Sequence, residues 1–179
     1  MVGMAASGKS TLARMLSSRL GLPLVDKDTV ALPIMQHLAS SGRFDPGDMD
    51  SPGAQELSPM FYEVSVALAA EQVNLGMSVV LTAPFNGRSV PGWSDSLAEA
   101  FGAGPVVLWI RTDPAAARGR IAARGLARDR FTLDNWDRFV SRTQFGPPHG
   151  PHLVLDAYTP SEDMFDLSLA YLVSHKVLL

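Results

Sequence analysis

The feature that most limits the possible folds of this sequence is the stretch GMAASGKST near its amino terminus, Gly3 to Thr11. It matches the pattern G-x-x-x-x-G-K-[ST], in which a glycine-rich loop joins the end of a buried parallel strand to the start of a helix. The expected helix follows at once, because apolar residues recur at helical spacing from Leu12 to Leu20 and Gly21 can end it. The motif therefore predicts an α/β fold with a parallel sheet.

The strand that should precede this loop is almost missing from the sequence. Only Met1 and Val2 stand ahead of Gly3, whereas an average strand has about five or six residues. We therefore expect a truncated first strand. Either residues upstream of Met1 have been lost, or the strand is simply stunted.

The rest of the chain alternates between short apolar runs and helical patterns. Further strands are predicted at 22–26, 77–82, 104–112 and 152–156. The pairs Ser58-Pro59 and Asp113-Pro114 are typical helix starts, a cap followed by proline at the first helical position. Strands joined by crossover helices form a parallel sheet covered on both faces, so we expect a three-layer α/β/α architecture. No repeat or linker divides the sequence, and we expect one domain, residues 1–179.

Composition excludes several classes of function. There is no cysteine, which rules out disulfides, thiolate metal sites and a cysteine nucleophile. The net charge of -3 gives no general attraction to nucleic acids or anionic membranes. No apolar run approaches the roughly 18 residues of a membrane-spanning helix, and the amino terminus lacks the pattern of a signal peptide. We expect a cytoplasmic protein with no membrane partner; the sequence leaves its oligomeric state open.

The glycine-rich loop is suited to hold the phosphates of a nucleotide. Gly3 and Gly8 allow backbone angles and a close approach that a side chain would block, and the following helix adds its positive end. Lys9 can reach the β- and γ-phosphates, and the hydroxyl of Ser10 can ligate Mg²⁺. The predicted nucleotide-binding residues are Gly3, Ser7, Gly8, Lys9, Ser10 and Thr11.

Two aspartates, Asp26 and Asp28, follow the second predicted strand, at the same edge of the sheet as the loop. A carboxylate there can accept the proton of a hydroxyl that attacks a γ-phosphate. Each also has a structural interpretation, because Asp28 can cap a helix that begins at Thr29 and Asp26 can simply end the strand. One aspartate can have both a catalytic and a structural role.

The order of these features resembles the small-molecule kinases of the P-loop superfamily. Gluconate and shikimate kinases carry a D-x-D at this point, and chloramphenicol phosphotransferase and the zeta-toxin-like kinases carry an aspartate there too. The stretch WIRTDPAAARGRIAARGLARDR, residues 109–130, is similar to the strand, helix and arginine-rich lid of chloramphenicol phosphotransferase. The resemblance covers most of the chain and is weakest at 41–56. This segment is rich in Gly, Pro and Asp, and we expect it to be a mobile loop that closes over the substrate.

The resemblance implies a five-stranded parallel sheet of order 2-3-1-4-5, ATP and Mg²⁺ as cofactors, and phosphorylation of a hydroxyl on an antibiotic, sugar or metabolite. It also implies that Asp28 is the general base and that Asp26 lies near the metal with Ser10. Many relatives end the third strand with an acidic residue that helps to hold Mg²⁺, but this chain has Thr82 there. Either Asp26 takes over the metal role, or Mg²⁺ is held mainly by Ser10 and the phosphates.

Arginines are concentrated in the second half of the chain, where eight lie within 111–142. Arg120 and Arg124 are four residues apart and so share one helical face. A forked guanidinium suits the charge that develops on a transferred phosphoryl group. Since the resemblance places lid arginines here, we expect a lid at 118–131 in which Arg120, Arg124 or both are catalytic. The alternative is a solvated basic face paired with nearby acidic residues (Asp129, Asp134 and Asp137).

Two other functions stay open beside the small-molecule kinase. Polynucleotide kinases share the phosphate loop, so a nucleic-acid end or a nucleotide is a possible acceptor. However, the chain is slightly acidic and has no basic stripe interleaved with aromatic residues, which argues against nucleic acid as a partner. The other possibility is a nucleotide-binding ATPase or regulatory module that has no acceptor. The absence of an N-K-x-D motif argues against a GTPase switch.

Overall fold

The computed structural model describes residues 1–42 and 52–177, and its strands are short and parallel. The strands are β1 (Val2–Gly3), β2 (Leu24–Asp26), β3 (Val80–Thr82), β4 (Leu108–Arg111) and β5 (Leu153–Asp156). β1, β4 and β5 form one sheet in the order β1-β4-β5, and β2 pairs with β3. The predicted α/β class with a parallel sheet is therefore confirmed.

The two sheets are joined through Met1. Its amino nitrogen donates a hydrogen bond to the carbonyl of Leu81 (2.6 Å), and the N–H of Ala83 donates to the carbonyl of Met1 (3.3 Å). β1 itself has only 2 residues, so it forms a ladder with β4 but is too short to form a regular one with β3 as well. The strands thus form a sheet of three and a sheet of two, and the continuous order 2-3-1-4-5 stays a prediction.

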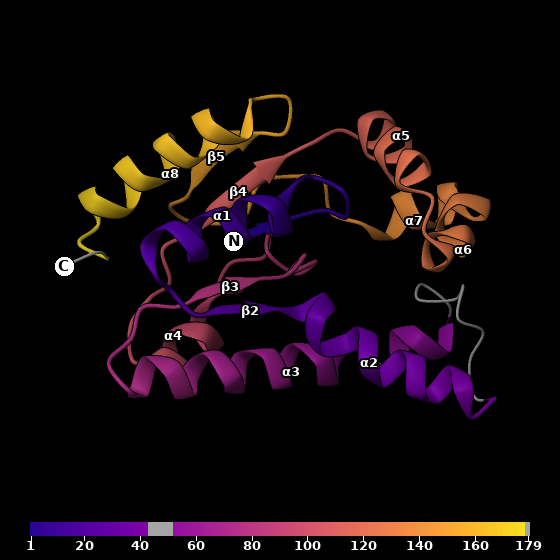
Figure 1. Ribbon diagram of the computed structural model, residues 1–179, viewed down its shortest axis with the longest axis horizontal. Coiled ribbons are helices and arrows are strands. Elements are labelled where there is room, and N and C mark those ends of the chain that lie inside the picture. The colour runs from indigo at the N-terminus through magenta and orange to yellow at the C-terminus, as the bar shows by residue number, and fades with distance from the viewer. Residues whose placement is uncertain (43–51, 178–179) are drawn as a thin grey trace.

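Helices cover both faces of the strands. They are α1 (Lys9–Leu20), α2 (Lys27–Ser40), α3 (Pro52–Asn74), α4 (Asp95–Phe101), α5 (Pro114–Arg124), α6 (Arg130–Asp134), α7 (Trp136–Arg142) and α8 (Ser161–Ser174), with a 3₁₀ helix at Ala127–Asp129. Figure 1 shows α1 and α8 on one face, α3 and α4 on the other, and α5, α6 and α7 grouped beyond one end of the strands. Within the described ranges, no helix combines the length and the apolar character needed to cross a membrane.

The main hydrophobic core lies between the strands and the α1/α8 layer. Leu12 and Leu16 of α1 pack there with Ile110 of β4, Leu155 of β5 and Phe165 of α8, all of them buried. Burying each such side chain contributes about 1.5–3 kcal/mol. This core fixes α1, and with it the glycine-rich loop, against the ends of β1 and β4.

The start of α3 differs from the sequence prediction. We expected Ser58-Pro59 to begin this helix, but α3 begins at Pro52 and contains Pro59. Pro59 has no N–H to donate, which is costly inside a helix. Leu57, which stands ahead of Ser58, packs with Phe61 in a cluster against α2, and this tertiary packing overrides the local signal. The predicted loop 41–56 is therefore shorter than expected at its end, and its residues 43–51 lie outside the described part of the chain.

A buried arginine ties the segment after β3 to the segment after α7. The side chain of Arg88 is fully buried and donates hydrogen bonds to the carbonyls of Pro84 (3.0 Å), Gly146 (3.3 Å) and Gln144. In return, the N–H of His149 donates to the carbonyl of Arg88 (2.7 Å). We call these contacts the Arg88 clasp. They hold together two segments that lie far apart in the sequence.

Candidate active site

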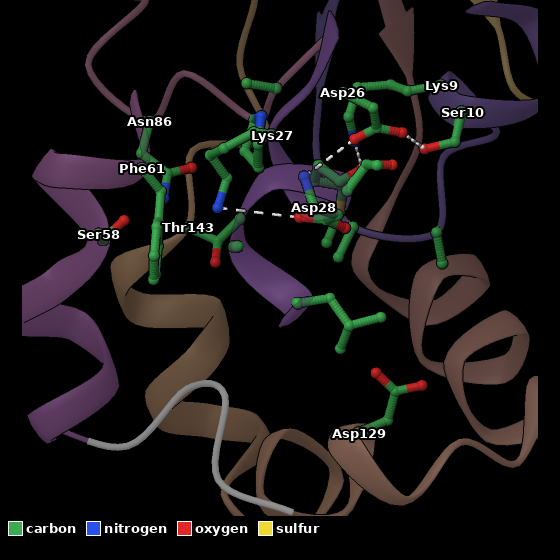
Figure 2. Close-up of a pocket in the computed structure, with 18 of the residues that line it drawn as sticks. Lys9, Ser10, Asp26, Lys27, Asp28, Ser58, Phe61, Asn86, Asp129 and Thr143 are labelled. Atoms are coloured by element: carbon green, nitrogen blue, oxygen red, sulfur yellow. Dashed lines mark hydrogen bonds and ion pairs between the residues drawn. The ribbon is translucent and has the colours of Figure 1, made fainter. Parts of the chain in front are cut away.

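A cavity with a volume of about 570 Å³ lies beyond the carboxyl ends of the strands. Its walls come from the glycine-rich loop, α1, α2, α3, the segment after β3, α5, the 3₁₀ helix and the end of α7. This is the edge at which ligands of parallel α/β sheets bind. The glycine-rich loop and both predicted aspartates line the cavity, as Figure 2 shows for several of these residues.

The glycine-rich loop has the predicted setting between a strand and a helix. Gly3 ends β1 with φ 145°, and a Cβ at this position would lie 2.7 Å from the carbonyl oxygen of Ile110. Gly8 adopts φ 101° as the N-cap of α1. Side chains would be strained at both positions, so the two glycines are needed for the turn and for the close approach to β4. The first residues of α1 line the cavity, and this end of a helix favours an anion.

Lys9 is buried at the base of this loop. Its Nζ donates a hydrogen bond to the carbonyl of Met4 (2.5 Å). Burial lowers the pKa of Lys9 to about 8, because the charged form loses its hydration. Asp28 and Asp26 act in the opposite direction, since their negative charges favour the protonated lysine. The protein thus holds a poorly hydrated cation, the Lys9 ammonium, at the phosphate loop.

Asp26 is a buried structural anchor at the end of β2. One carboxylate oxygen accepts a hydrogen bond from the hydroxyl of Ser10 (2.7 Å), and the other accepts one from the N–H of Asp28 (3.0 Å). Asp26 is therefore the N-cap of α2, which begins at Lys27. The sequence interpretation placed the start of this helix at Thr29, with Asp28 as its cap. That interpretation was wrong, because the helix begins two residues earlier, at Lys27.

Asp28 has more freedom than Asp26. Its side chain is 55% exposed and faces the cavity, and its described ion pair is with the adjacent Lys27, Nζ to Oδ1 3.8 Å. The structure thus separates the two aspartates: one is buried and fully engaged, and the other presents its carboxylate to the cavity (Figure 2). A proton acceptor needs the second kind of setting.

The oxygen atoms around Ser10 fit a magnesium ion. Mg²⁺ is usually held by one or two protein oxygens together with phosphate oxygens and water. Ser10 and Asp26 are in contact, and the β2–β3 register places Thr82 beside Asp26. The Thr82 hydroxyl is buried and has no hydrogen-bond partner among the described residues. A cluster of three or more His, Asp or Glu side chains able to hold a metal is absent from the described residues.

The two predicted lid arginines have different settings, although both line the cavity. Arg120 donates to the carbonyl of Ala157 (2.7 Å) and, at 3.4 Å, to the carbonyl of Ala6 in the glycine-rich loop. Arg124 instead donates from Nε and Nη2 to both carboxylate oxygens of the buried Asp129. The structure therefore brings Arg120 to the phosphate loop, whereas Arg124 is held by an acidic partner, as in the alternative interpretation.

Many residues of the cavity wall were not found from the sequence, and five of them matter for its chemistry. They are Lys27, Phe61, Tyr62, Asn86 and Thr143. The Tyr62 hydroxyl accepts a hydrogen bond from the N–H of Phe85 (3.1 Å), and burial raises the pKa of Tyr62 to about 12. Only Lys27 carried a usable signal, its place between the two aspartates. The others come from α3, α7 and the segment after β3, and nothing local marks them as neighbours.

Comparison with known proteins gives a family and a fold. A family model described as an AAA domain matches residues 1–145. A candidate kinase from Chloroflexus aurantiacus superimposes with a TM-score of 0.72 at 19% identity, over 97% of this chain and 93% of the other. A gluconokinase from Sinorhizobium meliloti has a TM-score of 0.59 at 16% identity, over 97% and 90% of the two chains.

A shikimate kinase from Aquifex aeolicus has a TM-score of 0.54 at 14% identity, over 98% of this chain and 96% of the other. No curated protein sequence matches this chain significantly. At these low identities the structures show the fold, and they confirm the resemblance to P-loop small-molecule kinases that the sequence motifs indicated.

Proposed function

The chain belongs to the AAA domain family, and from this membership and the cavity geometry we propose that it is an ATP- and Mg²⁺-dependent kinase of a small-molecule hydroxyl. The observation that carries the proposal is one cavity that holds a phosphate loop, an exposed carboxylate and a separate wall for an acceptor. We also propose that residues 1–179 form one domain. In it the strands continue as one sheet of order 2-3-1-4-5 through the two hydrogen bonds at Met1.

The phosphate loop supplies the nucleotide site of the proposed kinase. The backbone of Gly3 to Thr11, including Ser7 and Gly8, surrounds the phosphates, and Lys9 exchanges its bond to Met4 for the β- and γ-phosphate oxygens. Ser10 and Asp26 are the residues that would hold Mg²⁺. When bound, this ion would neutralise negative charge on the phosphates.

The proposed reaction begins at Asp28. The acceptor hydroxyl gives its proton to the Asp28 carboxylate as its oxygen forms a bond to the γ-phosphorus. The bond from that phosphorus to the oxygen bridging the β- and γ-phosphates breaks, and ADP leaves with the electron pair. Arg120, already at the phosphate loop, balances charge on the transferred group. Arg124 can join it only when it leaves Asp129, which would be the role of a lid at 118–131.

The function is tested by measuring ADP release with a panel of acceptors. The panel holds sugars, hydroxy acids, amino-alcohols, nucleosides, phenicol and aminoglycoside antibiotics, and an oligonucleotide with a free 5′-hydroxyl. We expect a rise in ADP release with one class of small molecule, with a phosphorylated product detected by mass spectrometry. A rise with the oligonucleotide alone would favour a nucleic-acid-end kinase. A constant rate with every acceptor would overturn the kinase and favour an ATPase module.

The lowered pKa of Lys9 predicts how nucleotide binding depends on pH. The protonated form binds phosphate, so affinity is greatest below the pKa of about 8 and falls as the pH rises above it. The nucleotide affinity falls by up to about tenfold per pH unit until the pH reaches the pKa that Lys9 has in the complex. Calorimetric titration with ADP and EDTA between pH 7 and 10 measures this. Lys9→Arg should give a flatter profile, because arginine stays protonated. A flat wild-type profile would contradict the prediction.

A further inference from the structure

A second lysine enters the cavity, on the side away from the phosphate loop. Lys27 is the first residue of α2, and its side chain is only 13% exposed. Its Nζ lies 5.2 Å from the ring centre of Tyr62 and 6.0 Å from that of Phe61. In Figure 2 it lies on the same side of the cavity as Asn86 and Thr143, and Lys9 and Ser10 lie beyond Asp26.

The other cations with described contacts in the cavity are already engaged by the protein. Lys9 and Arg120 donate to carbonyls of the phosphate loop, and Arg124 is paired with Asp129. Lys27 has only a loose ion pair, 3.8 Å from Asp28, beside aromatic rings. A largely buried ammonium gains much from a close anionic partner, because the rings exclude the water that would otherwise screen it.

We propose that Lys27 makes the acceptor side of the cavity selective for a hydroxyl compound that carries an anionic group, a carboxylate or a phosphate. This inference rests on the proposed kinase function and names its class of substrate. The Nζ offers three donors to the anion, while Asn86 and Thr143 offer neutral polar groups to the rest of the molecule. Because Lys27 and Asp28 are adjacent, the anion and the reacting hydroxyl lie close together on the acceptor.

The same geometry disfavours other acceptors. A cationic amino-alcohol would be repelled by Lys27 at the point where it approaches Asp28. A neutral polyol would leave the largely buried ammonium of Lys27 with no anionic partner beyond its loose pair with Asp28. Anionic acceptors should therefore bind more tightly than neutral compounds of the same shape, and cationic ones more weakly.

The test is direct binding of matched compounds by calorimetry, with the phosphate loop filled by saturating Mg²⁺ and β,γ-imido-ATP. The pairs are glycerate with glycerol and gluconate with sorbitol; glycerol phosphate forms the phosphate arm, and ethanolamine the cationic one. In wild type, an anionic compound should bind about tenfold or more tightly than its neutral counterpart. Lys27→Gln should abolish this preference, and Lys27→Arg should retain it. Comparing glycerate with glycerol phosphate then shows whether the site prefers a carboxylate or a phosphate.

Equal binding of anionic and neutral compounds to wild type, or no binding of either, would overturn the inference. A preference for anionic compounds that persists in Lys27→Gln would also overturn the inference. ADP affinity serves as the control for an intact fold and should be nearly the same in all three proteins. Selective binding of an anion without its phosphorylation would support the role of Lys27 while refuting the kinase. Equal phosphorylation of a neutral acceptor by wild type and Lys27→Gln would support the kinase while refuting the role of Lys27.

Discussion

Replacing Lys9 by methionine should lower the rate of phosphoryl transfer by about 10³-fold and leave the protein folded. Lys9 is the buried cation of the phosphate loop, and in the proposed complex it faces the oxygens on which negative charge develops. Methionine has a similar length and no charge, so it fills the space without the electrostatic contribution. Because burial already disfavours the charged lysine, its removal should cost the unbound protein little stability.

The measurement combines single-turnover kinetics with thermal unfolding of wild type and Lys9→Met. Lys9→Arg is the matched control, since it keeps the charge but changes the shape, and it should retain more activity than Lys9→Met. Full activity in a folded Lys9→Met protein would end the assignment of this loop to phosphate binding.

Asp28→Asn should lower kcat by about 10²–10⁴-fold and leave nucleotide affinity nearly unchanged. Asparagine cannot take the proton of the acceptor hydroxyl. The side chain is more than half exposed, and its described contact is the loose pair with Lys27, so the substitution should disturb neither α2 nor the phosphate loop. Steady-state kinetics and ATP titration at several Mg²⁺ concentrations measure the two effects separately.

Asp26→Asn is the matched substitution two residues away. Its amide oxygen can still cap α2, since asparagine caps a helix as well as aspartate does, but its amide nitrogen cannot accept the hydrogen bond from Ser10. We therefore expect a lower affinity for Mg²⁺ with little loss of stability. If Asp28→Asn turns over normally but binds ATP poorly, the two roles are reversed. If both variants behave alike, neither carboxylate acts as the base alone.

The parts of the site that the sequence predicted are those whose geometry depends on residues close together in the chain. Gly3, Gly8, Lys9 and Ser10 are fixed by the demands of one loop, and the structure places them as the motif requires. The start of α5 is a second case, because the side chain of Asp113 accepts a hydrogen bond from the N–H of Ala116, as a cap before proline should.

The parts that could not be predicted depend on contacts between distant segments. The early start of α3 goes with the packing of Leu57 and Phe61 against α2, which no local pattern encodes. The partner of Arg124 was one of several nearby acids, and only the fold selects Asp129. The acceptor side of the cavity combines residues from α2, α3 and α7, so its composition emerges only when these helices are assembled.

The Arg88 clasp has a consequence for how such a protein can change its preference among substrates. Asn86 and Thr143 line the cavity, each within two residues of a member of the clasp. The clasp therefore keeps two walls of the acceptor side at a constant spacing, whatever positions α5 and α6 take. In the proposed kinase, substitutions in the predicted lid at 118–131 should then alter the rate of phosphoryl transfer without altering which molecules fit. Selectivity and rate become separately adjustable properties, open to independent change in evolution or in engineering.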